Sequence, residues 1–147
     1  MTTKEVTYNE IKKAITIAFM EDKDIVNLYD PNVDVNSVDD VIVNMQDKLG
    51  ELGEDTKYKI LYEKGDIAGY YIYNELQLIS FSLNVKYRTR KYLRELFNFI
   101  KKEFQNTFIC TLWTKNKRAI RYLIKNGMEV MGQMGKDGNE TNLVYLK

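Results

Sequence analysis

The order of strand-like and helix-like segments after residue 75 constrains the fold of this chain most strongly. Residues 76–85 form an apolar strand-like run, and residues 108–113 form a second one. Between them, apolar side chains recur at the spacing of one helix face, at Leu93, Leu96, Phe97, Ile100 and Phe104. Parallel strands need a long crossover connection, usually a helix, whereas antiparallel neighbours need only a short turn. We therefore expect these two strands to pair in parallel.

The other strand-like segments predict hairpins. Residues 57–63 and 67–73 are rich in Tyr, Ile and Leu, and they flank the turn Lys64-Gly65-Asp66. Residues 128–134 and 142–146 are expected to form a last hairpin. A mostly antiparallel sheet with one parallel pair follows from this order.

Three more apolar stripes predict helices. Thr7 and Glu10 form a capping-box pattern just ahead of the first stripe. Residues 38–52 and 119–124 carry the other two, and residues 3–6 are expected to form a short leading strand. These elements predict one α/β (α+β) domain over residues 1–147, with a mixed sheet and about four helices on both of its faces.

Composition excludes several classes of site. The chain has no histidine, so histidine-based triads and histidine metal sites are impossible, and we expect no metal centre. Cys110 is the single cysteine, which excludes an internal disulfide, and its apolar neighbours predict a buried thiol. No apolar run approaches the length of a membrane helix or a signal peptide, so we expect a cytoplasmic protein.

The net charge of +1 hides an asymmetry between the two ends of the chain. Residues 1–55 carry 5 Lys/Arg and 13 Asp/Glu, whereas residues 56–147 carry 17 and 8. The basic residues concentrate in residues 86–125, which predicts either attraction of a phosphate-bearing or acidic partner or neutralisation by the acidic half. Basic and aromatic residues interleave around Lys86 and Arg94, but no nucleic-acid motif accompanies them, so nucleic acid is not expected.

Two segments carry a family pattern. Asn116-Lys117-Arg118-Ala119-Ile120-Arg121-Tyr122, followed by Asn126-Gly127-Met128, resembles a signature of the GCN5-related N-acetyltransferase (GNAT) family. The end of the strand at Leu83-Asn84-Val85 and the loop that contains Tyr87-Arg88 resemble the segment of that family that binds acyl-CoA. The resemblance covers nearly the whole chain and implies an acyl-CoA N-acyltransferase-like fold.

The resemblance also implies a cofactor and its contacts. Acetyl-CoA would place its pantetheine arm along Leu83, Asn84 and Val85, and its pyrophosphate near the turn before the third of the four long helices. That turn consists of Arg88, Thr89, Arg90, Lys91, Tyr92 and Leu93. Asn116 would open the next helix beside the cofactor.

The turn departs from the family pattern at two positions. Glycine lets a phosphate approach backbone N–H groups at a helix N-terminus. Lys91 and Leu93 occupy the two positions where the family has small residues. Arg90 and Lys91 can still attract phosphate by charge, and the alternative is a solvated basic turn that begins a core helix. The sequence therefore predicts a divergent member with altered motifs.

Acyl transfer to an amine needs a base and an acid. The position of the family's tyrosine acid is occupied by Leu123. Tyr122, displaced by about 100 degrees around the helix, is the candidate acid, and the alternative is a tyrosine that serves packing alone. Glu75 and Glu63 are the candidate bases. Gln77 and Ser80 stand where a carboxylate would have been useful.

Two functions from different classes remain open at this point. The first is an acetyl-CoA-dependent N-acetyltransferase. The second is a pseudoenzyme, a non-catalytic protein of the same fold that binds a protein partner or another copy of itself through the tyrosine-rich hairpin at residues 57–73 or the basic surface of residues 86–125. The composition is typical of an AT-rich genome, such as that of a phage or other mobile element. The second function would then be that of a virion component or of a host-directed factor in the host cytoplasm.

Overall fold

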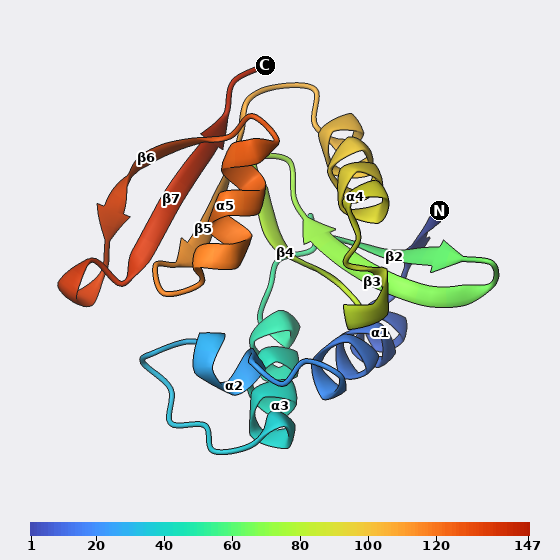
Figure 1. Cartoon of the computed structure of the whole chain (residues 1–147), viewed down its shortest axis with the longest axis horizontal. Coiled ribbons are helices and arrows are strands. Elements are labelled where there is room, and N and C mark those ends of the chain that lie inside the picture. Colours follow the sequence, from blue (N-terminus) through green and yellow to red (C-terminus); the bar gives the residue numbers. More distant parts are fainter.

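The computed structural model describes all 147 residues and contains one seven-stranded sheet. The strand order is β1-β2-β3-β4-β5-β7-β6, and the single parallel pair is β4 with β5 (Figure 1). The strands are β1 Thr2–Val6, β2 Lys57–Glu63, β3 Asp66–Tyr73, β4 Gln77–Leu83, β5 Phe108–Trp113, β6 Glu129–Met134 and β7 Glu140–Tyr145. The predicted parallel crossover, both hairpins and the leading strand are confirmed.

Five α-helices accompany the sheet. They are α1 Tyr8–Met20, α2 Ile25–Leu28, α3 Val38–Gly50, α4 Arg90–Glu103 and α5 Lys117–Lys125. Thr7 caps α1 with the predicted capping box, in which its side chain accepts from the Glu10 N–H and its own N–H donates to Glu10. The one-turn helix α2 was not predicted, since four residues are too few to show a period. Val85 was expected at the end of β4, but it begins a 3₁₀ helix of one turn, Val85–Tyr87.

The helices form two layers on opposite faces of the sheet, as predicted (Figure 1). One hydrophobic core packs α1 and α3 against the sheet and includes Ile60, Tyr70 and Ile72. The other core packs α4 and α5 against the sheet and includes Leu61 and Tyr71. Successive strand side chains point to opposite faces, which explains why the neighbours Tyr70 and Tyr71 belong to different cores. Both tyrosines are buried, so the hairpin tyrosines serve largely to build these cores.

The pairing of β4 with β5 is short. The two strands are paired only at Gln77 with Ile109 and at Leu78 with Cys110. On its other side, β4 has a bulge against β3 immediately after Leu78, where Ile79 has no partner. A bulge bends its strand and ends regular pairing, and bulges often lie beside functional sites. The remainder of β4 therefore separates from β5 and leaves a gap near the centre of the sheet.

Candidate active site

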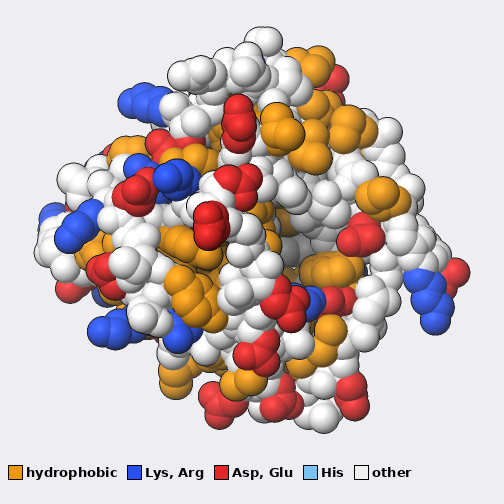
Figure 2. Space-filling view, turned by 180° about the vertical axis from the view of Figure 1, so that it is seen from behind, with side chains coloured by type: hydrophobic (Ala, Val, Ile, Leu, Met, Phe, Trp, Pro, Cys, Tyr) orange, Lys and Arg blue, Asp and Glu red, His pale blue; other side chains and the backbone are white.

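The gap between β4 and β5 opens into a cavity of about 540 Å³. Its lining comes from both helical layers, because Phe19, Tyr29 and Met45 belong to the α1–α3 side, and Leu93 and Tyr122 belong to the α4–α5 side. On the face opposite to the view of Figure 1, the surface is hollowed near its centre and hydrophobic side chains border the hollow (Figure 2). Such a cavity can hold two reactants that approach from opposite faces of the sheet.

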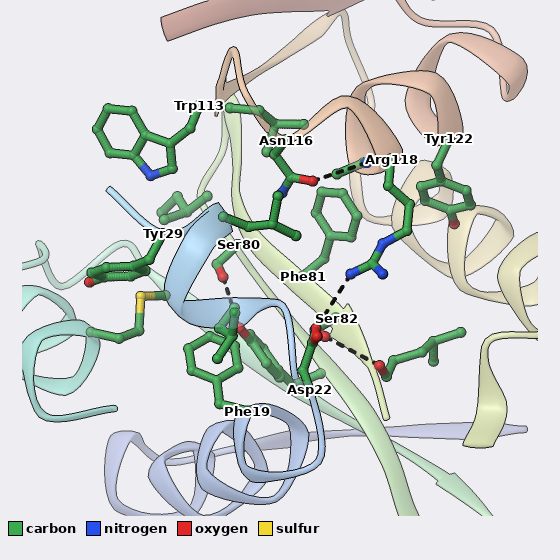
Figure 3. A pocket seen from close by; sticks show the side chains of 18 of the residues that line it. Phe19, Asp22, Tyr29, Ser80, Phe81, Ser82, Trp113, Asn116, Arg118 and Tyr122 are labelled. Carbon is green, nitrogen blue, oxygen red and sulfur yellow. Dashed lines mark hydrogen bonds and ion pairs between the residues drawn. The ribbon is translucent and has the colours of Figure 1, made fainter. Parts of the chain in front are cut away.

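The structure brings five of the sequence-predicted site residues together on the wall of this cavity: Leu83, Arg88, Leu93, Asn116 and Tyr122. Asn116 accepts a hydrogen bond from the N–H of Ala119 at 3.3 Å and so opens α5, as the family signature implies (Figure 3). The structure does not bring the other predicted cofactor contacts to the cavity wall, namely Asn84, Val85, Thr89, Arg90, Lys91 and Tyr92.

Asn84 and Tyr92 have structural partners of their own. The buried Asn84 side chain donates to the carbonyl of Ile67 at 2.8 Å and ties the end of β4 to the neighbouring hairpin, while its Oδ1 has no partner. Tyr92 packs edge-on against Tyr87, with ring centres 5.5 Å apart. These two side chains fix the position of the loop that joins β4 to α4.

The N-terminus of α4 has free hydrogen-bond donors. Thr89 precedes the helix, but its side chain caps none of the first-turn N–H groups. The N–H groups of Arg90, Lys91 and Tyr92 have no acceptor, whereas α1, α3 and α5 are all capped by a side chain. Arg90 and Lys91 are exposed at this end of the 14-residue helix. Their two positive charges and the positive end of the helix dipole therefore both attract an anion. This end of α4 suits an anion such as a pyrophosphate.

Arg88 has a different role from that of a free phosphate ligand. Its Nη2 lies 2.8 Å from Asp22 Oδ2, and its Nε donates to the carbonyl of Leu83 at 2.9 Å. Arg118 approaches the same carboxylate at 3.4 Å (Figure 3). Asp22 follows α1 and belongs to the acidic half of the chain, so this ion pair joins the two oppositely charged halves.

Asp22 is a poor general base in this setting. Burial by itself raises its pKa. The hydrogen bonds from Arg88 and from the N–H of Asp24, together with the charges of Arg88 and Arg118, outweigh burial and hold the pKa below its ordinary value of 3.8. Local sequence gave no signal for Asp22, since neither of its arginine partners is near it in the chain.

Tyr122 points toward α4. Its hydroxyl donates to the carbonyl of Leu93 at 2.6 Å, and its ring packs against Phe81 and Phe97. Burial raises its pKa well above the ordinary value of 10. Tyr122 therefore keeps its proton and can act as a hydrogen-bond donor at the cavity wall, while Leu123 is fully buried in the core.

The proposed carboxylate bases lie elsewhere. Glu75 is exposed at the turn between β3 and β4, and Glu63 pairs with the N-terminal ammonium group of Met1 at 3.3 Å. Neither residue, nor Gln77, lines the cavity, but Ser80 does, with its hydroxyl 3.0 Å from that of Tyr70. Burial raises the pKa of Tyr70 to about 12 and that of the Cys110 thiol to about 12, so neither group ionises near neutral pH.

No group of three or more His, Cys, Asp or Glu side chains is placed to hold a metal ion. No helix combines the length and the apolar character that a membrane span requires.

Several solved structures have the same overall arrangement. An acetyltransferase from Thermus thermophilus has a TM-score of 0.73 at 13% identity, over 100% of this chain and 98% of that one. The PaiA N-acetyltransferase of Thermoplasma acidophilum, solved in complex with coenzyme A, has a TM-score of 0.67 at 15% identity, over 100% of both chains. A spermidine N-acetyltransferase from Vibrio cholerae has a TM-score of 0.63 at 10% identity, over 99% of this chain and 95% of that one.

No family model and no curated protein sequence matches the chain. The identities to the solved structures are low, so the likeness concerns the fold. The sheet with its gap between β4 and β5 and the helices on both faces match these acetyltransferase chains over nearly their full length. The protein therefore has the GNAT acetyltransferase fold.

Proposed function

We propose that this protein binds acetyl-CoA in the gap between β4 and β5 and transfers the acetyl group to an amine. The observation that carries the proposal is the cavity itself, which passes between the separated strands and meets both helical layers. Arg88, in the loop after β4, and Leu93, in the first turn of α4, line it. When bound, acetyl-CoA supplies a thioester whose carbonyl carbon accepts the amine.

The residues present fit this ligand at two places. The three free N–H groups at the start of α4, with Arg90 and Lys91, suit its pyrophosphate. The strand end at Leu83, where β4 has no partner on the β5 side, suits the amide-rich pantetheine arm. Side chains at positions 91 and 93 keep phosphate farther from the backbone than glycine would, so charge carries more of the binding.

The chain's own groups contribute mainly by holding the reactants in place. Orientation alone can supply several kcal/mol of barrier reduction, roughly 7–11 kcal/mol in favourable systems. Tyr122, once its hydroxyl turns from the carbonyl of Leu93, would donate a hydrogen bond toward a leaving sulfur. Its raised pKa makes it a hydrogen-bond donor more than a source of a fully transferred proton.

Release of free coenzyme A thiol in the presence of acetyl-CoA and amines tests the proposal. Ser82→Trp would fill the gap, and Glu75→Trp at the exposed β3–β4 turn is the matched control. We expect the first variant to lose thiol release and the second to retain it, with folding checked by circular dichroism. Equal turnover in Ser82→Trp and the wild type would place the reaction elsewhere.

A non-catalytic binding protein is the second candidate, and the edge strand β6 is the observation that favours it. Val130, Met131 and Met134 are each about half exposed there, and unpaired strand edges can add a strand from a partner. Such a protein would act through a partner, as in a virion or on a host protein. A stable dimer or captured partner in the absence of acetyl-CoA binding would favour this candidate over the enzyme.

A further inference from the structure

The acceptor side of the cavity has a chemistry of its own, formed by α1, α2, α3, the residues that follow these helices, and the end of β5. Resting on the proposed acyl transfer, we propose that the acceptor is an apolar aromatic amine, whose nitrogen is neutral at physiological pH, and not a cationic polyamine. The proposal follows from the wall, the charges and the proton balance of this part of the cavity.

The wall is apolar and aromatic on this side. Phe19, Leu28, Tyr29, Met45, Leu52 and Trp113 all line the cavity. Tyr29 is buried, and its hydroxyl donates a 2.6 Å hydrogen bond to Asn44, which fixes the ring. The Tyr29 side chain is one of those that line the pocket in Figure 3. A flexible methionine such as Met45 adapts to flat ligands. Such a wall favours an aromatic body and penalises an unpaired ammonium group.

The aromatic faces already have a cation close to them. Lys48 Nζ lies 5.4 Å from the centre of the Tyr29 ring and 5.9 Å from that of the Trp113 ring. It also forms an ion pair with Asp30. The cation–π position that would attract a protonated amine is therefore occupied by a like charge.

The ionisable side chains of the lining do not favour a polycation. Lys48, Arg88 and Arg118 are positive, and Asp22 and Glu140 are negative. The carboxylate of Asp22 is committed to two guanidinium groups. The other acidic residues of α1 and α3, such as Glu10 and Asp39, are exposed and do not line the cavity.

The proton balance leads to the same acceptor. An alkyl amine is protonated at neutral pH and must lose a proton before it can attack. The carboxylate of Asp22 is a weak base, the chain has no histidine, and only Glu140 remains at the cavity. The lone pair of an aromatic amine is conjugated with its ring, so its nitrogen is already unprotonated.

The transfer balances without a strong base. The amine nitrogen forms a bond to the acetyl carbon, and the carbon–sulfur bond breaks with its electron pair on sulfur. The proton lost by the nitrogen ends on that sulfur, through solvent or a hydrogen bond shared with Tyr122. The products are an N-acetyl aromatic amine and a free thiol.

Trp113 gives a direct readout of acceptor binding, because it is the only tryptophan of the chain and lines the cavity. We expect 4-ethylaniline to change its fluorescence in a saturable way, and spermidine to leave it unchanged. The reverse result would overturn the inference while leaving acetyl-CoA binding intact. A separate titration with acetyl-CoA then decides the proposed function, and its failure would overturn both.

Turnover distinguishes the charge of the amine from the shape of its body. At pH 7 we expect kcat/KM for 4-ethylaniline to exceed that for phenethylamine by at least about tenfold, because the latter is mostly protonated. The ratio should fall as pH rises toward 10. Equal rates at pH 7, preference for spermidine, or turnover limited to alkyl amines would each overturn the inference.

Two variants and one control variant make this test more specific. Met45→Glu adds a carboxylate to the wall and should shift the preference toward phenethylamine, whereas Val43→Glu, exposed on the same helix, should not. Glu140→Gln removes the remaining cavity carboxylate. We expect the preference for 4-ethylaniline at pH 7 to persist in Glu140→Gln, and its loss would identify Glu140 as a base or cation anchor and contradict the proposal.

Discussion

Asp22 joins the acidic N-terminal half of the chain to the arginines of both family-like segments, and its replacement by asparagine isolates that charge. The variant keeps the shape of the side chain and its acceptor for the N–H of Asp24, 3.0 Å away. It removes the negative charge opposite Arg88 and Arg118. The predicted effect is a loss of folding stability at neutral pH.

The size of the effect follows from burial. The side chains of Asp22 and Arg88 are 7% and 21% exposed, so this pair lies between a surface pair and a fully buried one. Surface pairs contribute about 0–1 kcal/mol, and breaking a buried pair costs about 3–5 kcal/mol, which gives about 2 kcal/mol here. Arg118 is 53% exposed and adds little.

Urea unfolding at pH 7 measures this loss as a midpoint lower by roughly 1 M. Since the folded state lowers the pKa of Asp22, the carboxylate stabilises the fold above its ordinary pKa of 3.8, and that contribution disappears as pH falls through the lower folded value. Wild type and variant should therefore converge in acid. Asp24→Asn is the control, because Asp24 is 65% exposed. Equal midpoints at pH 7, or a difference that persists in acid, would show that the Asp22 charge does not stabilise the fold.

Three further outcomes are expected. Gly69→Ala should destabilise the protein by about 2 kcal/mol or more and disturb β4, since an added Cβ would lie 2.3 Å from the carbonyl oxygen of Ser82. Thermal unfolding measures this loss of stability, and unchanged stability would contradict the close approach of β3 and β4. Tyr122→Phe removes the hydrogen bond to the carbonyl of Leu93 and should cost about 1 kcal/mol of stability. Acetyl transfer should also slow, because the hydroxyl no longer assists the leaving sulfur, and full turnover would limit Tyr122 to packing. Cys110 should resist thiol reagents in the native protein up to pH 9, because burial raises the pKa of its thiol to about 12. It should react once urea unfolds the chain, and rapid labelling of the native protein would show that the strand opens.

The sequence predicted the framework because its signals were local or periodic. The capping box at Thr7 depends on neighbouring residues alone, and the crossover between β4 and β5 follows from a long apolar helix stripe between two strands. The start of α5 at Asn116 was also visible in the sequence. Such features need no knowledge of distant contacts.

The site was harder to predict because it depends on long-range contacts. Arg88 fits a family position, and only the fold shows that it pairs with Asp22, 66 residues away in the chain. Tyr122 was predicted at the site, but its bond to Leu93 depends on how two helices pack. The acceptor wall combines α2, α3 and β5 through Leu28, Met45 and Trp113, and no spacing rule links these residues.

Calorimetric titration with acetyl-CoA measures directly whether this protein binds the cofactor. We expect saturable binding to the wild type, weakened about tenfold (about 1.4 kcal/mol) in the double variant Arg90→Ala, Lys91→Ala at the start of α4. The charge-matched control, Lys102→Ala with Lys125→Ala, removes two exposed charges near helix C-termini and should bind as the wild type does. Absence of binding at millimolar acetyl-CoA would contradict the account, and equal affinities in the two double variants would place the ligand away from α4.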